Sequence, residues 1–472
     1  MCIRTLSGKV LKEVNAGQNF IPASNLKAVT TGAALKRLGA NFRFETSIAY
    51  SGTIGENGVL HGDLHIVGGG DPTLGSTAAL AVRKDSLFSR WGRAVRNAGI
   101  RSIAGSVVAD SRKMPAEVNG SWMYEDIGTY YGTTCSALMF NENCLDITIS
   151  PSPEPGSKVR MNRNGRPWMN IMNSCTTGPE GSGDRSYLLV TEFAPAGHLV
   201  GTYAADRKTK TVSYNDPFAD FSCAYEFASF LADHGIPCAA VTSTSPCHPT
   251  AAFHNDGVSF GFETFGSDES LSYTGYFTPC DSLSVITTTL SPRLAEIIRE
   301  TLRISNNLYA ETLLRAQAPD GSTDDALKTE ERTLEGMGVS TSRARIDDGS
   351  GLSRKNSVSP EFLVGFLTAM SRQNCFSTYL RAFNTPGPDE RLFSSAAPEL
   401  RRRIRLKSGS MGGVLCYCGY ILPSAPAISP EGTAKETASG ETIAFSIMIN
   451  DSTQSTARLR SYIESILNEY IK

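Results

Sequence analysis

Apolar and polar residues alternate over two short stretches at the start of the chain, and a helical pattern then replaces the alternation. The alternation predicts strands at Cys2–Thr5 and Val10–Glu13. Helix formers fill Ala23–Leu38, where Pro22 favours the helix start and Gly39 follows the last apolar residue. The sequence therefore predicts a strand pair that leads into a helix.

The middle of the chain is predicted to be mostly strands and loops. Strands are predicted at Phe42–Tyr50, Val59–His61, Leu64–Val67 and Ser106–Asp110, with a helix at Ser86–Asn97. Residues 150–275 carry several short alternating runs, which a helix at Ala224–His234 interrupts. We expect this part of the chain to be β-rich.

Helical spacing returns after residue 280. Helices are predicted at Pro292–Arg303, Asn307–Gln317 and Pro360–Ser371. The end of the chain is predicted to be three strands and a helix, at Arg403–Ser408, Gly413–Leu422, Thr442–Asn450 and Thr456–Ile471. Pairing with the N-terminal strands would complete one sheet, so the middle of the chain is predicted to be an insertion into an α/β domain.

Composition and charge narrow the class of protein. The chain has 472 residues, of which 40% are hydrophobic and 19% are charged, and its formal net charge is -2. These values are typical of a folded protein of two to four domains and give no electrostatic reason to expect a nucleic acid partner. We interpret the three arginines Arg401–Arg403 as an exposed turn before a strand.

Targeting signals are absent from the sequence. No apolar run is long enough to span a bilayer, and the residues after Met1 lack the pattern of a signal peptide. Because the first predicted strand begins directly at Cys2, we expect a leader and some mature residues to precede this sequence.

The eleven cysteines do not predict a metal site. They include no C-x-x-C pair, and Cys416 and Cys418 share one face of a predicted strand. Cys247 and His248 with His254 come nearest to a metal cluster, in a segment rich in serine, threonine and proline. We interpret the cysteines as free and buried, and we expect no metal and no cofactor.

A serine and a lysine stand one turn apart at the start of the first predicted helix. Positions i and i+3 share a helix face, so Lys27 can reach the Ser24 hydroxyl. A serine becomes a nucleophile when a base takes its proton, and lysine can be that base if burial and a nearby positive charge lower its pKa. The alternative is that Ser24 is only a helix cap.

Two further motifs follow downstream. Ser305 and Asn307 lie at a predicted helix boundary, where a hydroxyl can relay a proton and an amide can hold a lysine and a substrate carbonyl. The alternative for that pair is a set of capping residues. Lys407–Ser410 lies on a predicted strand whose edge a peptide could join, with a lysine to attract a carboxylate. The alternative is an edge-strand lysine with no role.

The order of the three motifs is more specific than any one of them. S-x-x-K, then S-x-N, then Lys-Ser/Thr-Gly is the set found in β-lactamases and penicillin-binding proteins. Ser24 and Ser305 are 281 positions apart, an interval far longer than in simple β-lactamases. The chain therefore resembles the class C low-molecular-mass penicillin-binding proteins, the D-alanyl-D-alanine carboxypeptidase/endopeptidase family. Further similar segments are Pro22–Lys27, Gly62–Leu64, Gly70–Leu74, Asn141–Asn143, Ser305–Glu311 and Asp348–Arg354.

The resemblance implies a domain plan. A β-lactamase/transpeptidase-like α/β domain would consist of residues 1–42 and 276–472. A β-rich second domain of residues 43–67 and 139–275 would be inserted into it, and residues 68–138 would form a third domain nested in the second.

The resemblance also implies a reaction. Ser24 would form an acyl-enzyme, with Lys27 as the base. Ser305 would pass the proton to the leaving D-alanine, while Asn307 would hold the substrate amide. The terminal carboxylate would bind Lys407 and two hydroxyls, and backbone N–H groups would form the oxyanion hole. The remaining residues of that strand assigned to binding are Ser408, Gly409, Ser410 and Met411.

The implied substrate is a peptidoglycan stem peptide, and β-lactams would be covalent inhibitors. A side-chain pocket would recognise the free end of the stem, with Asp126 meeting an ammonium group and Arg354 a carboxylate. The alternative for Asp126 is a helix cap or a surface charge. Tyr131, Leu352 and Met411 would complete that pocket. The family implies an extracytoplasmic location, in the periplasm or cell envelope, and peripheral membrane contacts or contacts between copies of the chain are left open.

Three alternatives were weighed against this interpretation. Gly257–Gly261 fits G-x-S-x-G, but the last histidine, His254, precedes that serine, whereas an α/β-hydrolase needs it afterwards. We therefore interpret the segment as a loop. A catalytically weak penicillin-binding scaffold is the second alternative, and a β-lactamase or esterase on the same fold is the third.

Overall fold

The computed structural model describes residues 1–162, 166–192, 194–245, 247–254, 257–263, 282–386, 393, 396–424 and 440–471. The chain forms two compact units. The first unit contains residues 1–42, 293–319 and 323–472, and the second contains residues 43–292 and 320–322. The predicted division into three domains stays a prediction, and its boundary at 275/276 lies outside the described residues.

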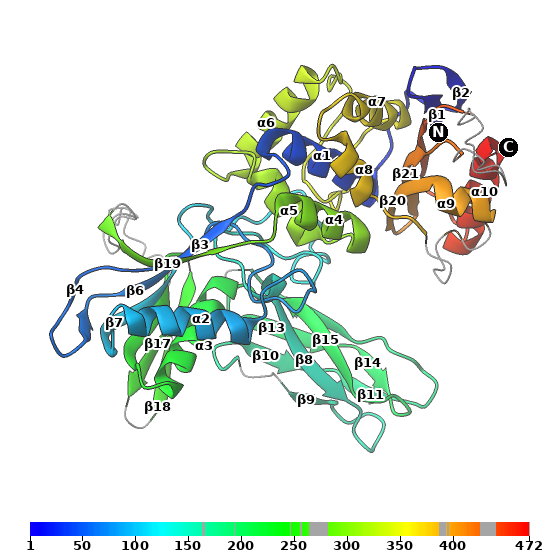
Figure 1. The fold of residues 1–472 in the computed structure, drawn as a ribbon. Coiled ribbons are helices and arrows are strands. Elements are labelled where there is room, and N and C mark those ends of the chain that lie inside the picture. Colours follow the sequence, from blue (N-terminus) through cyan, green and yellow to red (C-terminus); the bar gives the residue numbers. More distant parts are fainter. Residues whose placement is uncertain are drawn as a thin grey trace, which may run out of the picture. The chain divides into compact units, whose positions relative to one another are not determined.

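The first unit contains a sheet to which both ends of the chain contribute. Its described strands follow the order β2-β1-β22-β21-β20 and are paired antiparallel (Figure 1). Their bounds are β1 Cys2–Thr5, β2 Val10–Glu13, β20 Ile404–Met411, β21 Val414–Ile421 and β22 Ile443–Ile449. The predicted pairing of the N-terminal strands with the C-terminal strands is confirmed.

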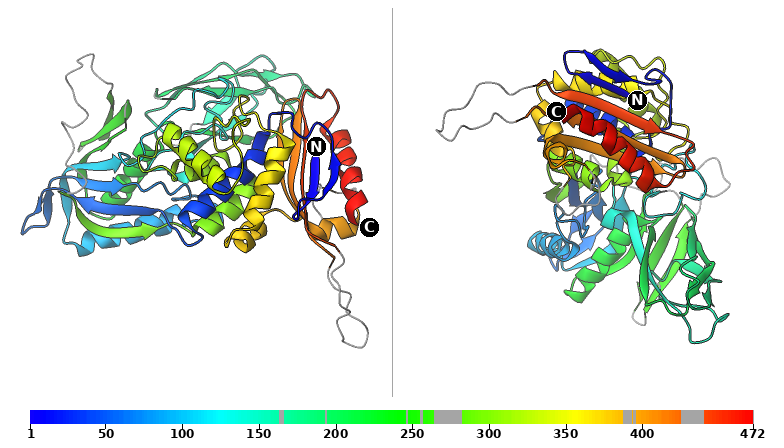
Figure 2. Two further views of the ribbon diagram at one scale, coloured as in Figure 1. Left: turned by 90° about the horizontal axis from the view of Figure 1, so that it is seen from above. Right: turned by 90° about the vertical axis from the view of Figure 1, so that its right-hand side faces the viewer.

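Alternation along β21 separates the two faces of this sheet. Leu415 and Tyr417 pack in a core with Ile463 and Leu467 of α10 (Thr456–Asn468), which lies along one face (Figure 2). Tyr420 points to the other face, where its hydroxyl donates to the Leu367 carbonyl of α7 (Pro360–Ser371) at 2.8 Å. The period of two in a strand thus sends alternate residues into two different cores.

Helices fill the rest of the first unit. They are η1 Ala23–Asn25, α1 Leu26–Leu38, α4 Leu294–Ile304, α5 Asn307–Arg315, α6 Thr323–Gly336, α8 Phe376–Ala382, α9 Pro398–Arg403 and η4 Glu469–Ile471. α1 is buried on nearly all sides, and it contacts α4, α5, α6 and α7. The helix that carries the predicted base, Lys27, is therefore the centre of this helical layer.

The second unit is built around a nine-stranded sheet in the described part of the chain. Its longest path is β18-β17-β16-β7-β6-β3-β19, and β4 and β5 extend it through β7. The bounds are β3 Glu45–Tyr50, β4 Thr53–Ile54, β5 Val59–His61, β6 Leu64–Val67, β7 Ser102–Asp110, β16 Cys238–Ser243, β17 His248–His254, β18 Gly257–Glu263 and β19 Ser284–Leu290.

Two helices and an aromatic core support this sheet. α2 (Lys84–Asn97) and α3 (Ala219–Asp233) contact each other, and Trp91 of α2 packs edge-on against Phe227 of α3 at 5.3 Å between ring centroids. Smaller sheets complete the unit, formed by β8 Cys144–Ser150, β9 Arg160–Asn162, β10 Asn170–Asn173, β11 Thr176–Gly178, β12 Tyr187–Val190, β13 Ala196–Val200, β14 Thr202–Ala204 and β15 Lys210–Asn215, with a short helix η2 Asn141–Asn143.

Two local predictions are wrong. Gly257–Gly261 is not a loop, because it lies in β18 and pairs along its length with β17. The arginines Arg401–Arg403 are not an exposed turn, because they end the short helix α9, and Arg403 donates to the Leu422 carbonyl at 2.6 Å. A continuous strand is not the strand-turn-helix corner of a hydrolase elbow, so Ser259 has no such role.

Candidate active site

Ser24 is held where a helix start meets a strand and a loop of the first unit. It lies in η1, and Ala23 before it is buried with φ +46, a conformation that is costly for a residue with a Cβ atom. A Cβ on Gly409 of β20 would lie 2.8 Å from the Ser24 nitrogen. A Cβ on Gly351 would lie 2.0 Å from the Ala23 carbonyl oxygen. Both glycines therefore permit backbone approaches that no other residue would allow.

Lys27 is fully buried one turn after Ser24. Its Nζ donates to Ser24 Oγ at 3.0 Å, to Asn307 Oδ1 at 2.6 Å and to the Ser350 carbonyl at 2.7 Å. An ammonium group has three donors, and these acceptors satisfy all of them. The Lys27 amine is thus fixed beside the nucleophile by three different segments.

Burial, together with the charge of Lys407, favours the neutral form of Lys27. Burial lowers the pKa of Lys27 well below its usual value, and the positive charge of Lys407 lowers it further. Asp348 and Glu311 act in the opposite direction. A lysine with a lowered pKa can accept a proton from a neighbouring hydroxyl at moderate pH.

Ser305 and Asn307 lie at the junction that was predicted for them. α4 ends at Ile304, and Ser305 then adopts a left-handed conformation with φ +60. Asn306 caps α5 by accepting from the Tyr309 N–H at 3.0 Å, which places Asn307 at the first position of that helix. The junction therefore points Ser305 and Asn307 to the same region of the first unit.

Lys407 is the second buried lysine of the site. Its Nζ donates to Ser305 Oγ at 2.9 Å and to the Ser408 carbonyl at 2.5 Å. Burial lowers the pKa of Lys407 to about 8. Cys418, which pairs with Lys407 from the neighbouring strand β21, opposes that shift. The five predicted catalytic residues thus form two contacting groups in one unit, and the Lys407 charge couples them.

The predicted binding strand runs past the nucleophile. Alternation places Gly409 on the face of Lys407 and against η1, while Ser408 and Ser410 alternate with them along β20. β20 is the last strand in the order of its sheet, Ser410 is exposed and Met411 is partly buried.

Arg354 and Leu352 lie near the end of this strand. Arg354 is exposed, and its Nη1 lies 3.5 Å from the carbonyl oxygen of Gly412, the residue after Met411. Leu352 is partly buried in the loop that contacts Lys27. The structure therefore brings Arg354, Leu352 and Met411 into the first unit with Ser24.

Asp126 and Tyr131 belong to the second unit. Burial and the negative charge of Asp126 raise the pKa of Tyr131. The Thr129 hydroxyl donates to the Asp126 carbonyl at 2.6 Å, which closes the turn between them. Their predicted place in a substrate pocket stays a prediction.

The sequence motifs assign no role to the Ser350 carbonyl, which accepts from Lys27, or to the buried carboxylates near it. Glu311 and Asp348 are buried carboxylates, and Ser350 presents a backbone carbonyl. Asp348–Arg354 is rich in glycine and serine, which is the signal that marks a tight loop. A backbone acceptor has no residue type of its own, so no motif identifies it.

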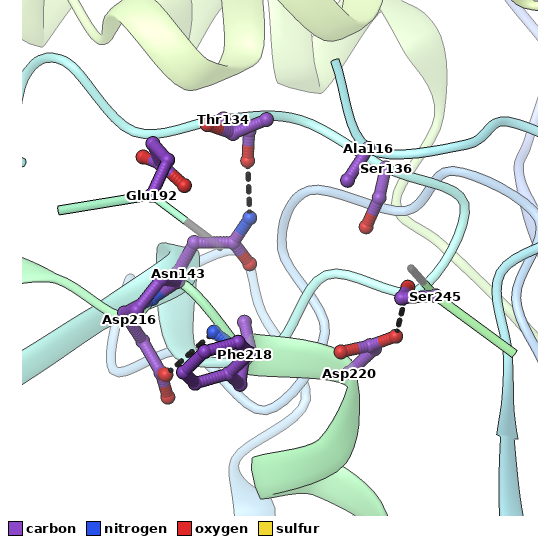
Figure 3. Close-up of a pocket in the computed structure, with 11 residues that line it drawn as sticks. Ala116, Thr134, Ser136, Asn143, Glu192, Asp216, Phe218, Asp220 and Ser245 are labelled. Atoms are coloured by element: carbon purple, nitrogen blue, oxygen red, sulfur yellow. Dashed lines mark hydrogen bonds between the residues drawn. The ribbon is translucent and has the colours of Figure 1, made fainter. Parts of the chain in front are cut away.

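The second unit contains a separate acidic pocket. Figure 3 shows Glu192, Asn143 and Asp216 on one side of it and Asp220 with Ser245 on the other. Burial raises the pKa of Glu192 to about 7. Asp220 accepts from Ser245 Oγ at 2.5 Å, and Asp216 accepts from the Phe218 N–H at 3.0 Å. Among the described residues, no group of His, Cys, Asp and Glu side chains is arranged to hold a metal ion.

The family follows from comparison with known proteins. The model of the D-Ala-D-Ala carboxypeptidase 3 (S13) family matches residues 1–240 and 278–470. The chain belongs to this family. The predicted family and enzyme class, a serine-type D-Ala-D-Ala carboxypeptidase, are therefore confirmed.

Relatives from distant organisms agree with this assignment. The chain is 26% identical to a D-alanyl-D-alanine carboxypeptidase of Actinomadura sp. (strain R39) over 437 residues, which cover 89% of this chain and 74% of that protein. It is 22% identical to a D-alanyl-D-alanine carboxypeptidase of Haemophilus influenzae over 480 residues, which cover 98% of this chain and 89% of that protein.

The fold is also known from a solved structure. Penicillin binding protein 4 of Haemophilus influenzae superposes with a TM-score of 0.77 at 21% identity, over 100% of this chain and 96% of that one. The predicted fold class, an α/β transpeptidase-like domain with additional β-rich structure, is confirmed. None of the described helices combines the length and apolar composition that a membrane span requires.

Proposed function

We propose that this D,D-peptidase acts on peptidoglycan stem peptides through an acyl-enzyme formed on Ser24. The observation that carries the proposal is the contact of 3.0 Å between Lys27 Nζ and Ser24 Oγ, made by a fully buried lysine whose pKa is lowered. A buried amine at this distance can act as the general base for a serine nucleophile.

Acylation then proceeds by proton transfer and attack. Lys27 in its neutral form takes the proton of Ser24, and the Ser24 oxygen attacks the carbonyl carbon of the penultimate D-alanine. The tetrahedral intermediate collapses when the peptide C–N bond breaks and Ser305 donates its hydroxyl proton to the leaving amine. Ser305 then takes up the proton that Lys27 received from Ser24, which leaves Lys27 neutral for the next step. Water then hydrolyses the ester, with Lys27 as the base, and releases the shortened peptide.

Two backbone N–H groups, those of Ser24 and Ser410, are proposed to stabilise the oxyanion. The close approach of Gly409 to the Ser24 nitrogen, where a Cβ would lie 2.8 Å away, supports this arrangement, because it brings β20 beside η1. Lys407 with the hydroxyls of Ser408 and Ser410 would bind the terminal carboxylate, and Asn307 would orient the substrate amide. Loss of one oxyanion donor typically costs about 10²–10³ in rate.

The recognition of the free end of the stem is also part of the proposal. The contact of Arg354 with Gly412 supports a shared pocket for Arg354, Leu352 and Met411, since Gly412 follows Met411 and Leu352 is two residues before Arg354. Asp126 and Tyr131 are proposed to meet the ammonium group of the stem. Because peptidoglycan lies outside the cytoplasm, we propose an extracytoplasmic site of action. Contacts with a membrane or with a second copy of the chain stay predictions.

β-Lactams are proposed to acylate the same serine, since they resemble the terminal dipeptide. A structure of the Haemophilus influenzae relative with a bound β-lactam has a TM-score of 0.72 with this chain at 19% identity, so the same framework in that protein holds such a molecule.

The test is covalent labelling with a fluorescent penicillin. We expect the wild-type chain to be labelled and Ser24→Ala to lose the label completely, with an unchanged thermal unfolding midpoint. Labelling of Ser24→Ala at the wild-type rate would disprove the acyl-enzyme. In the second arm, a stem pentapeptide and cross-linked muropeptides are incubated with both proteins, and the D-alanine released or cross-links cleaved separate carboxypeptidase from endopeptidase activity.

A further inference from the structure

A buried carboxylate lies behind the loop that contacts Lys27. Glu311 is in α5, four residues after Asn307 and therefore on the same helix face. Its side chain is buried and accepts from the Gly349 N–H at 3.1 Å and from the Ser350 N–H at 2.8 Å. Helix α5 thus supplies Asn307, which accepts a hydrogen bond from Lys27, and Glu311, which supports the loop whose Ser350 carbonyl accepts another.

A second buried carboxylate fixes the rest of that loop. Asp348 accepts from the Gly351 N–H at 2.8 Å, from the Ser353 N–H at 2.6 Å and from Asn356 Nδ2 at 2.8 Å. Asp348 is fully buried, and such charge-assisted bonds are among the stronger hydrogen bonds in proteins. The two carboxylates together leave the loop little freedom.

The loop transmits this rigidity to the base. The Ser350 carbonyl accepts from Lys27 Nζ at 2.7 Å, and the neighbouring Gly349 carbonyl accepts from Thr30 Oγ1 at 2.9 Å. Glu311 holds the Gly349 and Ser350 N–H groups, so it orients the peptide plane that carries the Gly349 carbonyl. The following plane, which carries the Ser350 carbonyl, continues from it, and its Gly351 N–H is held by Asp348. A misplacement of about 1 Å at such a site can cost about 10²-fold in rate.

We propose that Glu311 is a positioning residue for Lys27, because it fixes the Gly349–Ser350 peptide, from which the adjoining Ser350 carbonyl reaches Lys27 Nζ and holds it beside Ser24 Oγ. The inference rests on the proposed function, in which Lys27 is the base. Glu311 acts through the loop and through its charge, and it does not touch the reacting atoms.

The charge of Glu311 also affects the pH at which Lys27 titrates. Burial and the neighbouring charge of Asp348 raise the pKa of Glu311 to about 7. Around Lys27 the charged groups are Lys407 from β20, Asp348 from the loop and Glu311 from α5, and Glu330 of α6 faces Asp348. Ionised Glu311 stabilises the ammonium form of Lys27, so removing that charge moves the titration of Lys27 to lower pH.

The variant that tests this is Glu311→Gln. Glutamine has nearly the same volume and keeps one oxygen acceptor, but its amide group presents N–H donors to a backbone N–H. The matched control is Glu330→Gln, which neutralises another buried carboxylate of the first unit, one that accepts from Gln317 Nε2 at 3.1 Å. Ser24→Ala is included as the label control.

Two readouts are measured from pH 5 to pH 10. The first is the second-order rate of acylation by a fluorescent penicillin. The second is the titration of the Lys27 ammonium by NMR of protein labelled with ¹⁵N-lysine, where Lys27→Arg identifies the resonance. The NMR readout needs no turnover, so it tests the inference even if penicillin does not react.

We expect Glu311→Gln to acylate about 10²-fold more slowly at its optimum and to show both midpoints at lower pH. Glu330→Gln should keep the wild-type rate and midpoints. A Glu311→Gln protein with the wild-type rate and the wild-type Lys27 midpoint would overturn the inference. A loss of folded protein alone would lower the amplitude of labelling and leave the midpoints unchanged, which would also overturn it. Labelling that does not require Ser24 would instead count against the proposed function.

Discussion

The backbone of Ser305 decides where its hydroxyl lies. Its φ of +60 ends α4 and turns the side chain toward Lys407, whose Nζ donates to Ser305 Oγ at 2.9 Å. A left-handed conformation costs a residue with a Cβ atom roughly 1 kcal/mol relative to glycine. Ser305 therefore makes two contributions that can be separated: its hydroxyl contacts Lys407, and its left-handed backbone ends α4.

Substituting Ser305 separates these contributions. Ser305→Ala and Ser305→Gly both remove the hydroxyl that we propose as the proton relay, so we expect each to slow acylation by about 10²–10³, within the range for general acid–base groups. Glycine tolerates φ +60 at no cost, so Ser305→Gly should unfold at a higher temperature than Ser305→Ala. Penicillin labelling rates and thermal unfolding of both variants check this. Retention of wild-type acylation by Ser305→Gly would show that the residue contributes only its backbone.

At this scale, motif order was sufficient to select side chains that the structure brings into contact. Ser24, Lys27, Ser305, Asn307 and Lys407 are brought into contact as two linked groups. The Ser350 carbonyl and its support were not predicted. Any residue type can supply a backbone carbonyl, so only the folded chain distinguishes the one that faces Lys27.

At the scale of elements, the site depends on the close approach of η1, β20 and the loop after α6. Gly351 has φ +79, and a Cβ there would lie 2.0 Å from the Ala23 carbonyl. A side chain at this position would therefore be strained by the positive φ and would clash with the Ala23 carbonyl, and the loop or the helix start would have to move. Because Ser24 follows Ala23 directly, such a shift would also displace the nucleophile.

We therefore expect Gly351→Ala to destabilise the protein by about 2–4 kcal/mol, in the range typical of overpacking and backbone strain, and to reduce penicillin acylation at least tenfold. The matched control is Gly365→Ala in α7, where a Cβ would meet no atom within 4 Å. It should gain about 0.5–1 kcal/mol from helix propensity. Denaturant unfolding and labelling rates measure both. Equal effects of the two substitutions would contradict the proposed packing.

Elements with a clear hydrophobic period were predicted close to their true bounds, whereas those without one were not. Pro360–Ser371 has exactly the predicted bounds, and β5 and β6 also match. α6 was missed, because most of its residues are polar and its buried positions include Thr329 and Glu330. The sequence predicts a loop where β18 lies, because glycines interrupt the alternation there; pairing with β17 in the tertiary structure makes it a strand.

At the scale of the whole molecule, buried acids make stability depend on pH. Burial raises the pKa of Glu192, Glu311 and Glu330 to about 7 from an ordinary value of 4.5. Between these two values the folded protein keeps protons that the unfolded chain releases, so stability falls as pH rises from about 4.5 to 7. The contribution of these three carboxyl groups therefore makes the folded protein less stable at pH 8 than at pH 5.

Glu330→Gln tests this directly. The rise in the pKa of Glu330 from 4.5 to about 7 corresponds to roughly 3 kcal/mol. The variant should therefore be more stable than the wild type by up to about this amount at pH 8 and nearly equal to it at pH 5. Thermal and denaturant unfolding at the two pH values measure the difference. A difference that does not change between pH 5 and pH 8 would mean that Glu330 does not titrate in this window.

The sequence by itself determined the properties that depend on local spacing. The contact of Ser24 with Lys27 follows from positions i and i+3 of one helix, the sheet follows from alternation at both ends of the chain, and the order of the motifs identified the family. The tertiary structure alone decided the chemistry of Lys27. Its pKa and position depend on Lys407, Glu311 and Ser350, which are far away in the chain. Burial and the field of distant charges exist only when those segments pack together.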